Sequence, residues 1–250
     1  AHIDKHRKGK RKLVAASDKK LEQQPTSFQN YADVFAQLGY PIHMNFTSIY
    51  GDKQGNLATL PQEVFRVGDS SISLEDKHVT EPWIGIAPFA AHEGKIYPVQ
   101  LMEKVIQRLI HNHPQCHIFL FGGGANETPV MNEWAEKYPS VINASSHLHG
   151  LQQELILMSH LHVMLSMDSA NMHLASLVNT PVVSIWGATH PYAGFMGWHQ
   201  EPANAVQLDL PCRPCSIYGN KLCMRGDFAC MKNISPELVV EKIDKVLNQL

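Results

Sequence analysis

The chain has 250 residues, of which 44% are hydrophobic and 18% charged, and its formal net charge at pH 7 is −2. These values are typical of a soluble globular protein with one large domain or two small ones. No stretch reaches the about 18 apolar residues that span a bilayer, no signal peptide opens the chain, and no internal repeat occurs. The chain begins at Ala1 rather than methionine, which we interpret as a processed or truncated product.

The charge is distributed unevenly along the chain. Residues 1–20 hold eight basic and two acidic side chains, a net charge of +6, which leaves thirteen basic and twenty-one acidic ones, a net charge of −8, in the rest. A basic arm on an acidic body favours an anionic partner near the N-terminus. A solvated, partly disordered tail is an equally good interpretation.

The first 80 residues are irregular. Residues 28–40 form an amphipathic pattern that Gly39 and Pro41 terminate, so a helix is expected there. The segment 43–50 is compatible with a strand or a linker, and polar, turn-rich sequence fills 51–80. We interpret residues 1–80 as the end of another domain with its linker.

From residue 83 onward, apolar strands alternate with helical patterns. We predict strands at 83–89, 117–124, 141–145, 161–167 and 181–186, and helices at 99–110, 127–138, 151–160, 169–178 and 235–250. Strands of this kind, nearly continuous in apolar residues, belong to parallel sheets covered on both faces. Residues 81–250 are therefore predicted to be one doubly wound domain with an irregular excursion at 187–233.

One strand-to-helix junction carries chemistry. Asp168 follows the strand at 161–167, Ser169 occupies the N-cap position of the next helix, and His173 lies one turn further on the same face. In an open parallel sheet, ligands bind beyond the carboxyl ends of the strands, and a helix N-terminus favours phosphate. A merely capped helix with a hydrogen-bonded histidine is the alternative.

Two further loops are predicted at the same edge of the sheet. The loop at 87–98 has small residues and a single Lys95, a point charge suited to phosphate. The loop at 122–127 is rich in glycine and ends in Glu127, which is suited to ribose hydroxyls. Each loop alone is also compatible with a plain turn.

Four of the five cysteines form a cluster with C-x₂-C-x₇-C-x₆-C spacing: Cys212, Cys215, Cys223 and Cys230. A four-thiolate zinc site is one interpretation, because a C-x₂-C pair is its usual half. The second pair is widely spaced, however, so free or redox-paired thiols are the interpretation we favour, and no metal is assigned. Five cysteines do not make a disulfide-dense secreted domain, which favours the cytoplasm.

Several spaced motifs resemble a known family. The run D-S-A-x-x-H-L-A at 168–175, followed by N-T-P-V-V-S-I-W-G-A-T-H-P at 179–191, resembles that of the lipopolysaccharide heptosyltransferases, glycosyltransferase family 9. Pro88, Lys95, Tyr97 and Pro98 match the family in order, as does P-C-x-P-C…C…C-M-x-x-I-S-P-E at 211–237. The resemblance covers essentially all of 80–250.

The resemblance implies a GT-B fold with two Rossmann-like halves, of which this chain contains the C-terminal one and a remnant of the N-terminal one. It implies an inverting, metal-independent transfer of heptose from an ADP-sugar, without a cofactor. Lys95 would neutralise the leaving diphosphate, Glu127 would hold the adenosine ribose, and Asp168 with the N–H groups of Ser169 and Ala170 would contact sugar and diphosphate. His173 would be a further phosphate donor.

The sequence departs from the family in two places. Ala90 and Ala91 replace residues that often carry hydroxyl groups in the family, which leaves the donor identity open. Most of the N-terminal half, where the presumed catalytic carboxylate lies, is missing, so no catalytic residue is named. We expect this chain alone to bind donor weakly and to be nearly inactive.

The basic arm fits an anionic acceptor. Lys8, Lys10, Arg11 and Lys12 are candidate contacts to a lipid A–core saccharide at the surface of the inner membrane, with the protein on the cytoplasmic face. No aromatic interleaving or recognition helix supports nucleic acid. Another nucleotide-sugar enzyme on the same fold, or a non-catalytic nucleotide-sugar-binding module, remains the alternative function.

Overall fold

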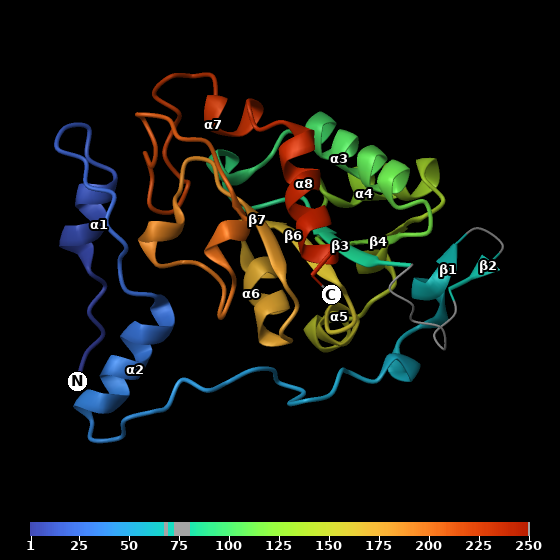
Figure 1. The fold of residues 1–250 in the computed structure, drawn as a ribbon, viewed down its shortest axis with the longest axis horizontal. Helices are drawn as coiled ribbons and strands as arrows, with labels where there is room; N and C mark the ends of the chain where they lie inside the picture. Colours follow the sequence, from blue (N-terminus) through green and yellow to red (C-terminus); the bar gives the residue numbers. More distant parts are fainter. Residues whose placement is uncertain (68–69, 73–80, 250) are drawn as a thin grey trace.

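A computed structural model describes residues 1–67, 70–72 and 81–249. Its centre is a six-stranded sheet in which every neighbouring pair of strands is parallel (Figure 1). The strands are β3 (Trp83–Ala87), β4 (His117–Leu120), β5 (Val141–Asn143), β6 (Val163–Met167), β7 (Val182–Ile185) and β8 (Ala205–Val206).

The strand order is β5-β4-β3-β6-β7-β8. The chain thus winds outward from β3 to β5, returns to the centre at β6 and winds outward in the other direction to β8. This is the doubly wound arrangement, and its switch point lies between β3 and β6. The predicted fold class is confirmed.

Helices cover both faces of the sheet, as the apolar strands predicted. The helices α3 (Val99–Asn112), α4 (Thr128–Lys137) and α8 (Pro236–Leu247) share one hydrophobic cluster with Ile84 and Ile86 of β3. The helices α5 (Leu151–Met158) and α6 (Ala170–Leu177) share the other cluster with Trp83 and Ala87. Alternate residues of the central strand therefore supply the two halves of the core.

The excursion at 187–233 contains elements that the sequence analysis missed. These are the edge strand β8, the 3₁₀ helices η5 (Pro191–Ala193) and η6 (Pro202–Asn204), and the short helix α7 (Ala229–Lys232). Strand β8 has only two residues, which pair with Ser184 and Ile185 of β7. A strand this short has no detectable alternation, and its pairing partner alone defines it.

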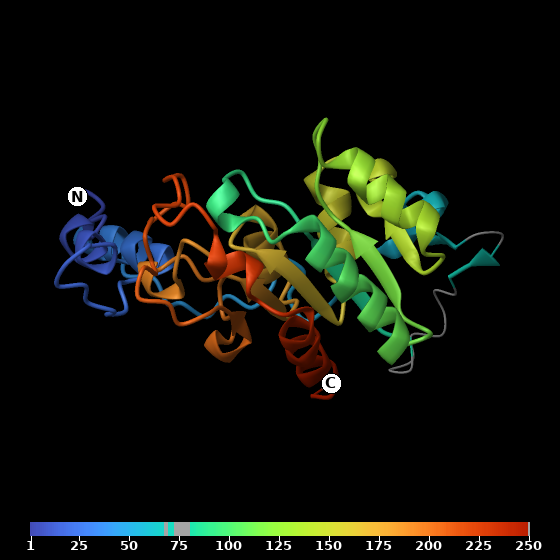
Figure 2. The ribbon, with the colours of Figure 1, turned by 90° about the horizontal axis from the view of Figure 1, so that it is seen from above.

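The N-terminal segment lies against one end of this domain. Helices α1 (Arg7–Leu13) and α2 (Ser27–Gln37) lie beside the excursion (Figures 1 and 2), and α1 contacts η5. Residues 41–48 are extended without strand pairing, so this part of the predicted strand or linker is a linker, and it leads toward the opposite end of the molecule (Figure 1). The basic arm is thus partly helical, and Leu13 anchors it with a fully buried side chain.

Residues 57–72 join the core of the sheet. The 3₁₀ helices η1 (Leu57–Thr59) and η2 (Gln62–Phe65) place Leu57, Leu60 and Val64 in the cluster that contains α5 and α6. A two-stranded ribbon follows, formed by β1 (Arg66–Val67) and β2 (Ser70–Ser71). The predicted boundary after residue 80 and the last residue of the predicted helix 235–250 lie outside the described residues.

No helix in the described part of the chain combines the length and apolarity needed to cross a membrane.

Candidate functional site

Lys95 and Asp168 meet at the switch point of the sheet. Lys95 ends the 3₁₀ helix η3 (Glu93–Lys95), which follows β3, and Asp168 directly follows β6. The Lys95 ammonium nitrogen lies 3.0 Å from Oδ2 of Asp168, and the side chains are 16% and 4% exposed. Because β3 and β6 are adjacent and parallel, two loops far apart in sequence form one ion pair.

Asp168 retains capacity to accept further hydrogen bonds. Its buried Oδ2 has no hydrogen-bond partner among the described residues, so the contact with Lys95 is electrostatic rather than a directed hydrogen bond. A buried carboxylate oxygen without a directed partner is costly in a folded protein. The Lys95 ammonium 3.0 Å away offsets part of this cost.

The start of α6 is exposed to a ligand beside Asp168. Ser169 holds the N-cap position with an extended backbone, as predicted, yet its side chain makes no capping hydrogen bond. Its hydroxyl instead lies 3.2 Å from the hydroxyl of Ser166. The first-turn N–H groups, beginning at the exposed Ala170, therefore lack a side-chain acceptor and keep the positive end of the helix dipole available.

His173 lies within the electrostatic reach of both charged groups. Burial lowers the pKa of its imidazole below the ordinary value, Asp168 raises it, and Lys95 lowers it further. The balance keeps the ring neutral at pH 7, so it donates one hydrogen bond at most. Of the predicted donor-binding residues, Lys95, Asp168, Ser169, Ala170 and His173 are thus brought together.

Glu127 lies apart from this group. It follows β4, on the side of β3 opposite to β6, and its Oε2 accepts a hydrogen bond of 2.9 Å from the N–H of Gly123 in its own loop. The carboxylate therefore lies at the predicted edge of the sheet but two strands away from Asp168. An extended ligand would be needed to contact both.

Three loops pack closely around Lys95. The N–H of Ala188 donates to the carbonyl of Gly94, and the N–H groups of Cys215 and Ser216 donate to the carbonyl of Ala188. A Cβ on Gly219 would lie 2.6 Å from Cγ of Lys95, so the backbone at Gly219 forms part of the wall along the lysine side chain. Only glycine fits there, and its φ of +77° is a second reason.

Arg213 holds these loops together through hydrogen bonds to their backbone. It was not among the residues predicted from the sequence. The residue is 5% exposed, and its guanidinium donates to the carbonyls of Trp186, Gly187, Thr189 and Leu208 and to Oε1 of Gln207. Five acceptors for one guanidinium make full use of its fixed fork geometry. Arg213 therefore fixes the path of the chain from the end of β7 to the cysteine-rich segment.

The four clustered cysteines line one cavity of about 440 Å³ together with Lys19 and Arg225. All are free thiols. Lys19 donates to the carbonyls of Pro211, Arg213 and Pro214, so the basic arm is tied to the C-x₂-C turn. No group of three or more potential metal ligands within the described ranges is arranged to hold an ion.

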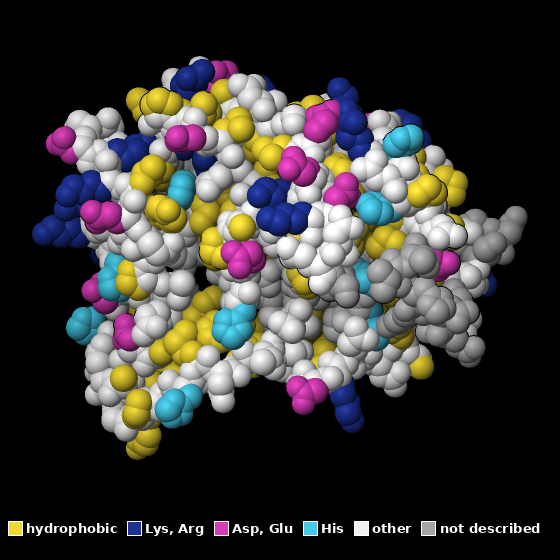
Figure 3. All heavy atoms as spheres, viewed as in Figure 1, with side chains coloured by type: hydrophobic (Ala, Val, Ile, Leu, Met, Phe, Trp, Pro, Cys, Tyr) yellow, Lys and Arg dark blue, Asp and Glu magenta, His cyan; other side chains and the backbone are white. Residues whose placement is uncertain are grey.

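The predicted basic residues divide into two groups. Lys10 and Arg11 line a cavity of about 440 Å³, together with Lys5, Arg7 and Lys221, whereas Lys8 and Lys12 do not line it. Figure 3 shows Lys and Arg side chains gathered at the end of the molecule where α1 lies.

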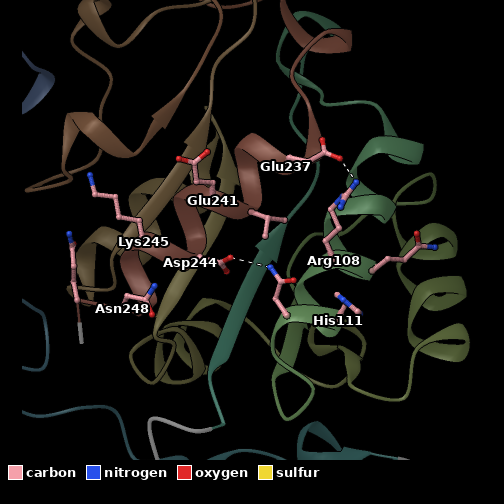
Figure 4. A pocket seen from close by; sticks show the side chains of 11 residues that line it. Arg108, His111, Glu237, Glu241, Asp244, Lys245 and Asn248 are labelled. Carbon is pink, nitrogen blue, oxygen red and sulfur yellow. Dashed lines mark hydrogen bonds and ion pairs between the residues drawn. The ribbon is translucent and has the colours of Figure 1, made fainter.

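A larger groove of about 880 Å³ lies between α3 and α8 (Figure 4). Arg108 forms an ion pair with Glu237, and Asp244 accepts hydrogen bonds from Asn112 and His113. Each of these side chains is thus already partnered within the protein. The groove also lies on the flank of the sheet rather than at its switch point, so we do not consider it the functional site.

Comparison with known sequences decides the family. The sequence profile of glycosyltransferase family 9 (heptosyltransferase) matches residues 6–223. The chain belongs to this family. The family predicted from the motifs is confirmed, and two of the segments that carried the prediction, those of Lys95 and Asp168, meet at the switch point.

Two curated relatives of this family 9 chain are lipooligosaccharide heptosyltransferases 2 of Campylobacter jejuni subsp. jejuni. The protein of serotype O:2 is 30% identical over 144 residues, and that of serotype O:6 is 29% identical over 143 residues. Each alignment covers 54% of this chain and 43% of the relative. The chain thus spans less than half the length of the curated relatives it matches.

Solved structures support the GT-B fold. The family 9 glycosyl transferase of Veillonella parvula has a TM-score of 0.61 at 17% identity, covering 92% of this chain and 62% of that one. The E. coli heptosyltransferase WaaC with ADP has a TM-score of 0.56 at 15% identity, covering 90% and 58%. At these identities the likeness establishes the fold alone.

Proposed function

We propose that this family 9 chain binds an ADP-sugar, and that the protein transfers a heptose, or a related sugar, from it to a saccharide of the lipopolysaccharide core. The resemblance of its motifs implies an inverting transfer without a metal ion. The names of the Campylobacter relatives support this substrate class. The observation that carries the proposal is the convergence of Lys95, Asp168 and His173 at the switch point of the sheet.

The chemistry required is stabilisation of a leaving diphosphate. In a displacement at the anomeric carbon, negative charge develops on the diphosphate as the glycosidic bond breaks, and fixed positive groups lower the barrier. Lys95 supplies a full charge, and the first-turn N–H groups of α6 supply partial charges from a second direction. His173, neutral before binding, donates a hydrogen bond to a phosphate oxygen.

Asp168 and Glu127 have complementary tasks in this proposal. A carboxylate repels phosphate, so Asp168 accepts hydrogen bonds from sugar hydroxyls while it holds the Lys95 ammonium in place. Glu127, beyond β4, holds the ribose of the adenosine. The donor then lies across β3, with its diphosphate near β6 and its nucleoside near β4.

The acceptor belongs on the side of the basic arm. Lys10 and Arg11 are proposed contacts to the anionic saccharide, and Lys8 and Lys12 remain predictions without a place in the same cavity. A lipid-linked acceptor requires a position at the cytoplasmic face of the inner membrane, which we propose as the place of action.

Calorimetric titration with ADP-glucose, ADP-heptose and UDP-glucose tests the donor site. We expect the ADP-sugars to bind and the UDP-sugar to bind at least about tenfold more weakly. Lys95→Met should weaken the binding of ADP-sugars by about tenfold or more, since it removes a charge-assisted contact. Lys104→Met is the matched control, because Lys104 is exposed on the neighbouring helix α3.

Three outcomes would contradict the proposal. Indifference of the protein to all sugar nucleotides would remove the donor site. Equal affinity for UDP-sugars would favour another nucleotide-sugar enzyme on the same fold. Equal losses in Lys95→Met and Lys104→Met would show that only net charge matters.

A further inference from the structure

The cavity between the basic arm and the excursion is lined by five cations: Lys5, Arg7, Lys10, Arg11 and Lys221. We call it the basic pocket. No acidic side chain lines it, and none of the five cations is ion-paired with a carboxylate within the part of the chain that the structure describes. Its volume of about 440 Å³ lies within the range of small-molecule sites.

The helical form of α1 concentrates this charge. Arg7, Lys10 and Arg11 are spaced i, i+3 and i+4, so they project from one face of the helix, whereas Lys8 and Lys12 lie about a third of a turn further round. Like charges at these spacings repel one another. The arrangement works against the stability of α1 unless an anion occupies the pocket.

The pocket also partly removes a charge from water. Lys10 is half-buried, and its ammonium lies 4.5 Å from the centre of the Phe195 ring, which in turn contacts the ring of Tyr218 at 5.7 Å. Burial lowers the pKa of Lys10. An ammonium held against an aromatic ring at the rim of a cavity is a directed contact rather than a freely solvated one.

The basic pocket shares a wall with the Lys95 site. Tyr218 and Lys221 line the pocket, and Gly219 between them packs against the Lys95 side chain. The N–H of Gly219 donates to the buried hydroxyl of Ser216, which fixes the turn. One loop, residues 216–221, therefore separates an unneutralised cationic cavity from the proposed leaving-group site.

We propose that the basic pocket binds a phosphate group carried by the acceptor saccharide, so that the protein selects phosphorylated acceptors. This inference rests on the proposed function for its acceptor. Phosphate fits because five convergent cations exceed what a single carboxylate neutralises, and Arg and Lys are the usual partners of phosphate. Binding there brings a neighbouring hydroxyl of the acceptor toward the donor across the 216–221 loop.

The test compares two charge-matched double variants. Lys10→Gln/Lys221→Gln removes two charges from the pocket, one from each wall, and Lys53→Gln/Lys104→Gln removes two from exposed positions that do not line it. Each protein is titrated with deacylated, phosphorylated core saccharide, with the same saccharide after removal of its phosphates, and with phosphatidylglycerol vesicles. ADP-glucose binding is measured in parallel.

We expect the pocket variant to bind the phosphorylated saccharide at least about tenfold more weakly than the unmodified protein, the other variant to bind it within about twofold, and ADP-glucose to bind all three alike. Equal losses in both variants, or equal affinity for the dephosphorylated saccharide, would overturn the proposal. The proposal would also be overturned if the protein bound the vesicles but not the saccharide and the pocket variant bound the vesicles more weakly. That result would assign the pocket to a lipid headgroup. Because ADP-glucose binding is measured separately, failure of the protein to bind ADP-glucose can be distinguished from failure of the pocket to bind the phosphorylated saccharide.

Discussion

The Lys95 ammonium lies 3.0 Å from a carboxylate oxygen of Asp168, and both side chains are largely buried at the switch point of the sheet. Comparing variants of this pair distinguishes the contribution of the two residues to stability from their contribution to ligand binding. Breaking a buried pair from one side leaves an uncompensated charge, whereas removing both charges does not.

Lys95→Met is expected to lower the free energy of unfolding by about 2–3 kcal/mol and to weaken ADP-sugar binding by about tenfold or more. The double variant Lys95→Met/Asp168→Asn should recover most of the stability without recovering the affinity. Urea denaturation and calorimetry measure the two quantities. A double variant that binds ADP-glucose as tightly as the unmodified protein would show that Lys95 only neutralises Asp168.

His173 should make donor binding depend on pH. Burial, reinforced by Lys95 and opposed by Asp168, lowers the pKa of the imidazole in the free protein. A nearby diphosphate raises this pKa, so the complex takes up a proton and affinity rises as pH falls. ADP-glucose binding should therefore tighten by about threefold between about pH 7.5 and 6, since its esterified diphosphate does not titrate there. In His173→Gln the affinity should be flat across this range, and an unchanged pH slope in that variant would contradict the assignment.

His190 should make the fold sensitive to acid. Its Nδ1 accepts a hydrogen bond from the N–H of Tyr192, and burial, with Arg213 second, lowers its pKa to about 4. Between these two pKa values the His190 imidazole is protonated in the unfolded chain but neutral in the folded one, so stability is lost as pH falls from about 6.5 toward 4. With screening at the half-exposed ring, the loss is about 1–2 kcal/mol. Thermal unfolding of His190→Asn, which keeps an acceptor, should show a smaller acid-side decrease; an identical decrease would assign the effect to other groups.

Arg213 should control the order of the loops around Lys95. Lysine keeps the charge but cannot reach five acceptors, so Arg213→Lys is expected to cost about 3 kcal/mol and to weaken ADP-sugar binding in the remaining folded protein. Arg225→Lys is the control, because Arg225 is exposed, pairs with the nearby Asp227 and lies on the same excursion. Its cost should stay within about 0.5 kcal/mol. Similar melting temperatures for the two variants would refute the positioning role.

Gly219 and Gly226 provide a comparison of steric fit. Both have positive φ, +77° and +73°, but a Cβ on Gly219 would collide with the Lys95 side chain, while one on Gly226 would meet nothing within 4 Å. Alanine at either position costs about 1 kcal/mol in backbone strain. Only Gly219→Ala should also weaken ADP-glucose binding, by about fivefold or more, because it displaces Lys95. Equal affinities would show that the wall does not constrain the lysine.

Local pattern predicted much of this fold. The apolar runs that contain β3, β4, β6 and β7 are continuous because both faces of the sheet are covered, and this made them recognisable. Helix α1 was not predicted because it has no apolar periodicity: it is mostly charged, and its one anchoring side chain, Leu13, packs only when the rest of the chain is in place. Strand β8 could not be predicted because its two residues show no alternation and are defined only by their pairing with β7.

The sequence by itself determined the family, the parallel sheet and the loops that carry Lys95, Asp168 and His173, since motif order and apolar periodicity are properties of neighbouring residues. Only the tertiary structure decided which of those side chains meet. Strand β3 lies between β4 and β6, so Glu127 and Asp168 lie on opposite sides of the Lys95 loop; Lys95 pairs with Asp168, while Glu127 accepts a hydrogen bond from Gly123. Arg213 and the basic pocket likewise depend on contacts between segments distant in sequence, which no local pattern encodes.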